Sequence, residues 1–230
     1  MSQETPVDRG AVLDEEATEF EHRFELFGEL VRSARSVSAA VAWWTDEGLP
    51  EINVIAARDR VLTLPEYKTL DGKHHNRGHE RLGLLRSGGP RQQVVAWTRA
   101  VVLPDRLPAS VRMRLGIAHP DNPGPAAATG EPIGVVLAEL GTRAARVDTT
   151  VTSILGRQDA VGCDLVYACT GVWVVDGVPA VQVVEEFLRS VIEDFAPPGR
   201  LERFRQLDDK LAGCEEDSVD RCLVSADQGC

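Results

Sequence analysis

Short apolar segments that occur in pairs constrain the fold of this chain more than any other feature. Three pairs, each separated by turn-forming residues, are 37–44 with 52–57, 81–86 with 93–103, and 166–175 with 180–187. The last pair is joined by Asp176-Gly177, a strong β-hairpin signal. Hairpins join antiparallel strands, whereas parallel strands need long crossovers. We therefore predict an antiparallel sheet in an α+β fold.

Helical periodicity predicts the elements that flank the sheet. An amphipathic helix is expected over residues 19–34, because aromatic and apolar residues recur there at helical spacing. The residues at this spacing are Phe20, Phe24, Phe27 and Val31. The segment 133–140 is opened by a proline and stopped by a glycine, which is typical of a short helix. Apolar positions over 187–195 suggest that the last strand continues into a helical segment.

The remaining segments define the expected domain organisation. Residues 1–18 are polar and acidic, and we predict a disordered N-terminus. One domain is expected over 19–195, followed by a partly mobile C-terminal extension over 196–230. Within the domain, 145–155 is predicted to be a strand, and the polar segment 64–80 a long surface loop.

Composition excludes several classes of protein. The chain has 230 residues, 43% of them hydrophobic and 27% charged, which suits one ordinary soluble domain. No segment approaches the roughly 20 apolar residues that span a bilayer, and the N-terminus lacks a secretory signal. We therefore expect a cytoplasmic protein with no membrane partner. A formal net charge of −11 argues against a nucleic-acid partner.

Cysteines and histidines give little support for a metal site. The five cysteines are expected to be reduced thiols, and they include no Cys-x-x-Cys pair. His75 and His79 are four residues apart, but Gly72 and Gly78 favour a loop, and no third ligand is evident. We predict no metal and no cofactor. His79 lies just before Arg81 and is a candidate for contact with a ligand.

Five short motifs follow one another between residues 81 and 188. They are Arg81-Leu82-Gly83-Leu84-Leu85, Arg99-Ala100-Val101-Val102-Leu103-Pro104, Glu131-Pro132-Ile133-Gly134, Val175-Asp176-Gly177-Val178-Pro179 and Glu185-Glu186-Phe187-Leu188. In order and spacing they resemble the chorismate pyruvate-lyase family. The resemblance implies an antiparallel sheet with flanking helices that enclose a small-molecule pocket. The same fold serves as the effector-binding domain of some bacterial transcription regulators.

The resemblance also implies residues that bind substrate. The family splits chorismate into 4-hydroxybenzoate and pyruvate without a cofactor. Arg81 would hold the ring carboxylate and Arg99 the enolpyruvyl carboxylate, since arginine binds a carboxylate through two parallel hydrogen bonds. Ile133 would supply an apolar wall and a backbone amide. Trp97 shares a strand face with Arg99 by alternation and is a candidate to pack on the ligand ring.

A glutamate completes the implied catalytic site. Together with Arg81 as the second catalytic residue, Glu185 would donate a proton or hydrogen-bond the ring oxygen, with Glu186 in reserve. The glutamate lies one residue further from its hairpin proline than in the family, and a one-residue shift in a strand reverses the face. Whether Glu185, Glu186 or neither faces inward is therefore open. Without the resemblance, arginines on hairpins are most often surface residues in cross-strand charge pairs.

Three functions are compatible with this pattern. The first is a carbon–oxygen lyase that acts on chorismate or a related carboxylic acid. The second is a non-catalytic small-molecule-binding module. The third is an enzyme of the same fold used for another reaction in specialised metabolism. Under the first two functions the expected partner is a small anionic carboxylic acid. The expected assembly is a monomer or a homodimer.

Overall fold

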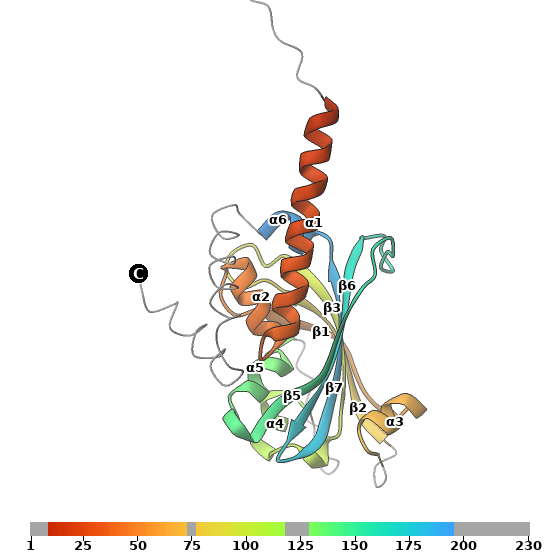
Figure 1. Ribbon diagram of the computed structural model, residues 1–230. Helices are drawn as coiled ribbons and strands as arrows, with labels where there is room; N and C mark the ends of the chain where they lie inside the picture. The colour runs from red at the N-terminus through yellow and green to blue at the C-terminus, as the bar shows by residue number, and fades with distance from the viewer. Residues whose placement is uncertain (1–8, 73–76, 118–128, 196–230) are drawn as a thin grey trace, which may run out of the picture.

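The computed structural model describes residues 9–72, 77–117 and 129–195 and shows an α+β fold (Figure 1). Within these residues the sheet has seven antiparallel strands in the order β4-β1-β2-β3-β7-β6-β5. The strands are β1 Glu51–Val61, β2 Arg77–Arg86, β3 Val94–Val102, β4 Thr129–Gly130, β5 Ala144–Ser153, β6 Leu165–Val175 and β7 Val178–Leu188. The predicted fold class, an antiparallel sheet with flanking helices, is confirmed.

Six α-helices and two 3-10 turns are present in the described residues. They are α1 Arg9–Ser33, α2 Val37–Thr45, α3 Leu64–Thr69, α4 Ala109–Arg114, α5 Ile133–Ala138 and α6 Ser190–Phe195, with η1 Pro104–Arg106 and η2 Gly141–Arg143. Helices α1, α2, α5 and α6 lie on one face of the sheet, whereas α3 lies at the end of the opposite face (Figure 1). The second face is otherwise free of helices among the described residues.

Two of the predicted hairpins form as expected. β2 pairs with β3, and β6 pairs with β7. The β6–β7 turn contains Asp176 with φ of 50° and Gly177 with φ of 81°. These positive values are the ones that a tight hairpin turn requires, and Asp and Gly accept them at low cost.

The segment 37–44 is a helix and not the strand that we predicted. Ser36 caps α2 by accepting a hydrogen bond from the amide of Ala39 at 3.1 Å. Val37, Val41 and Trp44 are buried at helical spacing, but the helix is apolar on its other sides as well. Because it is covered by the sheet and by other helices, it lacks the polar face by which a helix is recognised.

Two further boundaries differ from the prediction. α1 begins at Arg9, so residues 9–18 of the segment that we predicted to be disordered are helical. Their Ala, Leu and Glu residues are strong helix formers even without an apolar stripe. The segment 64–80 contains α3 and the start of β2 in addition to a loop. A capping box between Thr63 and Glu66 begins α3.

Some predictions concern residues that lie outside the described part of the chain. They are the prediction of disorder for residues 1–18, as far as it concerns residues 1–8, and the prediction of a partly mobile extension over residues 196–230. Among the helices that the structure describes, none is long and apolar enough to cross a membrane.

The helix-covered face buries two apolar clusters, one at each end of the sheet. The first lies under α1, α2 and α6 and includes Phe27, Trp44 and Phe187. The second lies under α4 and α5 and includes Leu137, Trp173 and Val183. On β7, Glu185 stands between Val183 of one cluster and Phe187 of the other. The fold therefore places one carboxyl at the boundary between two apolar cores.

Close contact at one glycine fixes α1 on the sheet. A Cβ atom at Gly28 would lie 2.6 Å from the hydroxyl oxygen of Tyr167, so only glycine allows this approach. The Tyr167 hydroxyl donates a hydrogen bond to the carbonyl oxygen of Phe24 at 2.9 Å. The rings of Phe24 and Tyr167 are stacked with their centroids 4.2 Å apart. The C-terminal half of α1 is thereby held above β6.

Candidate functional site

A pocket opens between the two apolar clusters on the helix-covered face. Its empty volume of about 550 Å³ includes open solvent at its mouth. Most of the wall is apolar and comes from the sheet, from α2 and from the start of α5. The polar side chains that line it are Ser38, Arg81, Thr98, Arg146 and Glu185.

Arg81 brings an uncompensated positive charge into this pocket from β2. Its residue exposure is only 3%, and no side chain of the described residues forms an ion pair with it. Its Nη1 atom is buried without a hydrogen-bond partner among the described residues. Burial lowers the pKa of Arg81 to about 10, so the guanidinium is still charged at neutral pH.

Glu185 faces the same pocket from β7. It is 9% exposed, and it pairs across the sheet with Thr98 on β3 and Cys169 on β6. Burial raises the pKa of Glu185 to about 7, with the charge of Arg146 opposing the shift. Below this pH the side chain is a neutral carboxyl group that can donate a hydrogen bond.

The strand register settles which glutamate points inward. Alternation puts Val183, Glu185 and Phe187 on the helix-covered face and Glu186 on the other. Glu186 lies 3.4 Å from Nη2 of Arg157 on that opposite face. The pocket therefore contains Glu185, the first of the two alternatives, and not Glu186.

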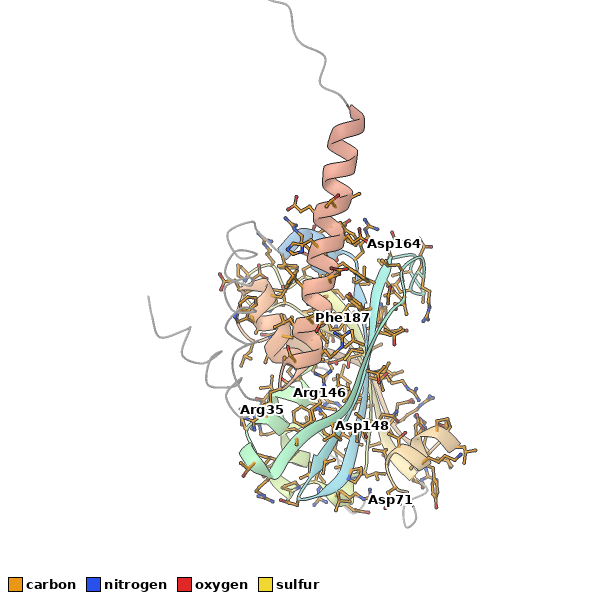
Figure 2. The ribbon with its side chains drawn as sticks, in the orientation of Figure 1. Arg35, Asp71, Arg146, Asp148, Asp164 and Phe187 are labelled. Carbon is orange, nitrogen blue, oxygen red and sulfur yellow. The ribbon has the colours of Figure 1, made fainter. Side chains whose placement is uncertain are left out.

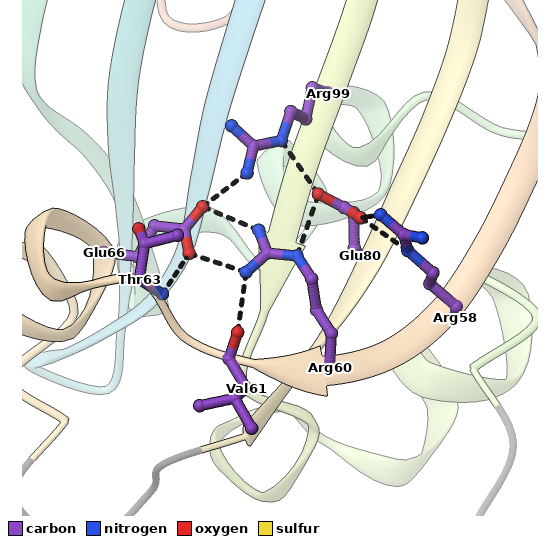
Figure 3. A network of polar contacts seen from close by, with 7 residues as sticks. All are labelled: Arg58, Arg60, Val61, Thr63, Glu66, Glu80 and Arg99. Atoms are coloured by element: carbon purple, nitrogen blue, oxygen red, sulfur yellow. Dashed lines mark hydrogen bonds and ion pairs between the residues drawn. The ribbon is translucent and has the colours of Figure 1, made fainter.

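Arg99 does not line the pocket. The prediction that Arg81 and Arg99 face one ligand together is therefore wrong. Arg81 stands opposite Ala100 in the β2–β3 ladder, which puts Arg99 on the opposite face of the sheet. There its Nε donates to Glu80 at 2.9 Å and its Nη2 to Glu66 at 2.6 Å (Figure 3). Arg99 is thus part of a charge network.

That network contains three arginines and two buried carboxylates. Arg60 donates to Glu66 through Nη1 and Nη2 at 2.7 and 2.6 Å, and lies 2.9 Å from Glu80 (Figure 3). Arg58 completes it with a 2.9 Å bond to Glu80. The hydrogen bond from Arg60 is the main reason that the pKa of Glu66 falls to about 2. The network joins α3 to strands β1, β2 and β3.

Trp97 and His79 also lie away from the pocket. Trp97 is on the same outer face as Arg99, where its Nε1 donates to Asp159 at 2.8 Å. His79 is on the face of Arg81 by alternation, but it does not line the pocket, and its Nδ1 is 2.8 Å from a carboxylate oxygen of Asp59. The prediction was that both contact the ligand, but neither lines the pocket. The register between neighbouring strands determines which groups each side chain meets.

Ile133 lies where it was expected. It is buried at the first position of α5 and lines the pocket together with Pro132 and Gly134. A Cβ atom at Gly134 would lie 3.1 Å from that of Ser36. This close approach holds the start of α5 against the junction between α1 and α2.

Arg146 is the main pocket residue that sequence analysis did not identify. It reaches the pocket from β5, and its Nη2 donates to Sγ of Cys169 at 2.8 Å. Burial raises the pKa of the Cys169 thiol to about 12, so this cysteine is a thiol and not a thiolate. The only available signal in the sequence was a lone arginine within a predicted strand. Ser38 and Thr98 were missed as well, because short hydroxyl residues carry no pattern.

Among the described residues, no group of three or more His, Cys, Asp or Glu side chains is arranged to hold a metal ion. Cys163 is exposed and Cys169 is buried, and both are free thiols.

Comparison with known proteins supplies similarity of fold only. No protein-family model matches the sequence. A search of curated proteins finds no significant match. Among solved structures, PhnF from Mycobacterium smegmatis is 14% identical, with 65% of this chain and 60% of that chain covered and a TM-score of 0.43. The chain thus spans less than two thirds of PhnF.

Two further structures belong to proteins that are named as GntR-family transcriptional regulators. The ligand-binding domain of one from Bordetella bronchiseptica is 13% identical over 62% of this chain and 86% of that chain, with a TM-score of 0.41. Another from Enterococcus faecalis is 7% identical over 59% of this chain and 91% of that chain, with a TM-score of 0.37.

These matches overturn the prediction of an enzyme. We expected a carbon–oxygen lyase, but two of the three matched structures are named as transcriptional regulators and none is named as a lyase. No comparison supports chorismate as a substrate. What is confirmed of the pattern implied by the resemblance is the antiparallel sheet with flanking helices that the structure of this chain shows.

Proposed function

We propose that the chain is a non-catalytic domain that binds a small organic acid in the pocket, with the carboxylate held by Arg81. The observation that carries this proposal is the state of Arg81. The residue is 3% exposed, it lines the pocket, and its Nη1 is buried without a partner among the described residues.

A buried, unpaired cation is costly, and this cost favours an anionic ligand. Removing a guanidinium from water costs several kcal/mol unless a counter-charge and hydrogen bonds replace the lost hydration. A carboxylate does both at once, because it accepts two parallel hydrogen bonds from the planar guanidinium. An acid therefore forms an ion pair and two hydrogen bonds with Arg81, and it should bind more tightly than a neutral molecule of the same shape.

The rest of the pocket defines the other end of the ligand. Ile52, Leu85 and Trp173 give apolar walls that suit a ring or a branched hydrocarbon body. Glu185 as a neutral carboxyl group donates a hydrogen bond to a hydroxyl, ether or carbonyl oxygen of the ligand. The ligand class is thus a small organic acid with an apolar body and a second, uncharged oxygen.

Calorimetric titration with a matched pair of probes tests this proposal. We expect 4-hydroxybenzoate to bind and 4-hydroxybenzamide, its uncharged counterpart, to bind at least tenfold more weakly, since about 1.4 kcal/mol corresponds to a factor of ten. Arg81→Gln should remove the preference for the acid. Arg99→Gln on the outer face is the control and should keep it. Equal affinity for the two probes, or an unchanged preference in Arg81→Gln, would show that the proposal is wrong.

The non-catalytic part of the proposal has its own readout. After prolonged incubation with the protein, chorismate should be recovered without release of 4-hydroxybenzoate or pyruvate above the rate in buffer alone.

A cytoplasmic location, and a monomeric or homodimeric state, stay predictions.

A further inference from the structure

Arg146 lies where the pocket meets the end of α1. Figure 2 shows it between β5 and the helices that cover the sheet. Its Nη1 donates to the carbonyl oxygen of Val31 at 2.9 Å and to that of Ala34 at 3.3 Å. The last carbonyl groups of a helix have no partner within the helix, and a positive charge there also favours the helix dipole. Arg146 therefore caps α1 from the sheet.

The same guanidinium rests on the floor of the pocket. Its Nη2 is bonded to Cys169, and a Cβ atom at Gly171 would lie only 3.0 Å from its Nε. Both Gly171 and Arg146 line the pocket. Contacts with Cys169 and Gly171 thus fix the position of the Arg146 side chain. The side chain in turn bonds the carbonyl groups at the end of α1.

The junction between α1 and α2 also forms part of the pocket wall. Val37 and Ser38, the first two residues of α2, line the pocket. Ser36 caps α2 and packs against the start of α5. The eight residues from Val31 to Ser38 therefore contact Arg146 at one end and the pocket at the other.

We propose that Arg146 couples the pocket to the C-terminal end of α1. An oxygen of a bound acid that contacts the guanidinium holds it on the α1 carbonyl groups and slows local opening of the α1–α2 junction. Arg146 acts here as a positioning residue. The effect of a ligand rests on the proposed function, whereas the coupling between the pocket floor and α1 does not.

A substitution on the pocket floor tests the coupling without a ligand. Gly171→Ala pushes on Nε of Arg146, whose Nη1 bonds the carbonyl groups at the end of α1. Hydrogen–deuterium exchange of the amides of residues 31–40 should become about three- to tenfold faster, as expected for the loss of one or two hydrogen bonds of ordinary strength. Gly130→Ala is the matched control. Its Cβ would lie 3.2 Å from Nη2 of Arg81 and should leave exchange over 31–40 unchanged.

Making Gly171→Ala both in the wild-type chain and in Arg146→Met distinguishes coupling through Arg146 from a general loss of stability. In Arg146→Met, exchange over 31–40 should already be fast, and adding Gly171→Ala should change it no further. Arg146→Lys keeps the charge and should restore part of the protection. If Gly171→Ala has no effect in the wild-type chain, or the same effect in both backgrounds, the coupling does not exist.

The ligand effect is measured in the same experiment with 4-hydroxybenzoate as the probe. Saturation should slow exchange over 31–40 in the wild-type chain and leave it unchanged in Arg146→Met. Calorimetric binding without this slowing would overturn the ligand effect. Absence of binding would count against the proposed function instead, and the Gly171→Ala comparison would still decide the coupling.

Discussion

Glu185 is the residue in which burial and register together produce an unusual ionisation. It lies on the buried face of β7 between the two apolar clusters, where only Arg146 opposes the effect of burial on its pKa. Sequence alone left Glu185 and Glu186 as alternatives, because a shift of one residue exchanges the two faces of a strand. The pairing of Glu185 with Thr98 resolves the choice, and this pairing is a property of the assembled sheet.

The raised pKa of Glu185 predicts a stability that falls as the pH rises. With a pKa of about 7 in the folded chain and the usual 4.5 in the unfolded chain, the folded state binds more protons between these values. Unfolding free energy should therefore decrease from pH 4.5 to pH 7 on account of this group. Glu185→Gln should remove that decrease and be more stable than the wild type at pH 8 by on the order of 3 kcal/mol. Urea unfolding at pH 5 and pH 8 measures both quantities.

Glu186→Gln is the control for this experiment, since Glu186 is half-buried on the outer face. It should show the pH dependence of the wild type. If Glu185→Gln and the wild type lose stability in parallel between pH 5 and pH 8, Glu185 is not the group that titrates.

Arg81 and Arg99 show which features of the pocket can be predicted from residue types alone. Both were assigned to one pocket by resemblance, and both lie on the predicted hairpin. Their relative facing depends on the pairing of Arg81 with Ala100, which no local pattern encodes. Arg81 could thus be found from the sequence, whereas the outer position of Arg99 could not.

At the scale of elements, the charge network on the outer face is what holds α3. Glu66 is 5% exposed and accepts hydrogen bonds from Arg60, Arg99 and the amide of Thr63. A short helix of six residues has little stability of its own. Its position therefore depends on these bonds to the neighbouring strands.

Removing the Glu66 carboxylate should destabilise the chain at neutral pH. Glu66→Gln leaves two guanidinium groups without one of their acceptors, and we expect a loss of about 2 kcal/mol in urea unfolding at pH 7. Because the pKa of Glu66 is lowered to about 2, its contribution is complete above pH 4.5 and is lost as the pH falls toward 2. The loss caused by Glu66→Gln should therefore shrink at low pH.

Glu131 gives a matched comparison on the surface. It pairs with Arg114 in an exposed position, where ion pairs contribute little. Glu131→Gln should change the unfolding free energy by less than about 0.5 kcal/mol. An equal effect of the two substitutions would mean that the buried network does not support α3.

The helices show which elements sequence patterns can and cannot predict. α5 and α6 were predicted because proline and glycine or a change of period mark their ends. α2 was read as a strand because it is apolar all round, and only its contacts with the other helices explain that composition. The role of Arg146 in capping α1 was out of reach, since it joins residues 115 positions apart.

At the scale of the whole molecule, a strongly acidic chain encloses a positive pocket. The formal net charge is −11, yet the charged or acidic side chains that line the pocket are two arginines and one carboxyl group that is neutral below pH 7. Net charge therefore excludes partners that need a broad basic surface but not a small anion in an enclosed site. The separation of two apolar clusters by this pocket is the feature on which the proposed binding site depends.

The most direct test of this account is the position of a bound acid. In crystals grown with 4-bromobenzoate, the anomalous signal of bromine locates the ring, and the electron density orients the carboxylate. We expect the ring between the two apolar clusters, with the carboxylate on Arg81 and within reach of neither Arg99 nor Arg58. Density for the acid on the outer face at the Arg58–Arg99 network, with no acid in the pocket, would contradict the central claim.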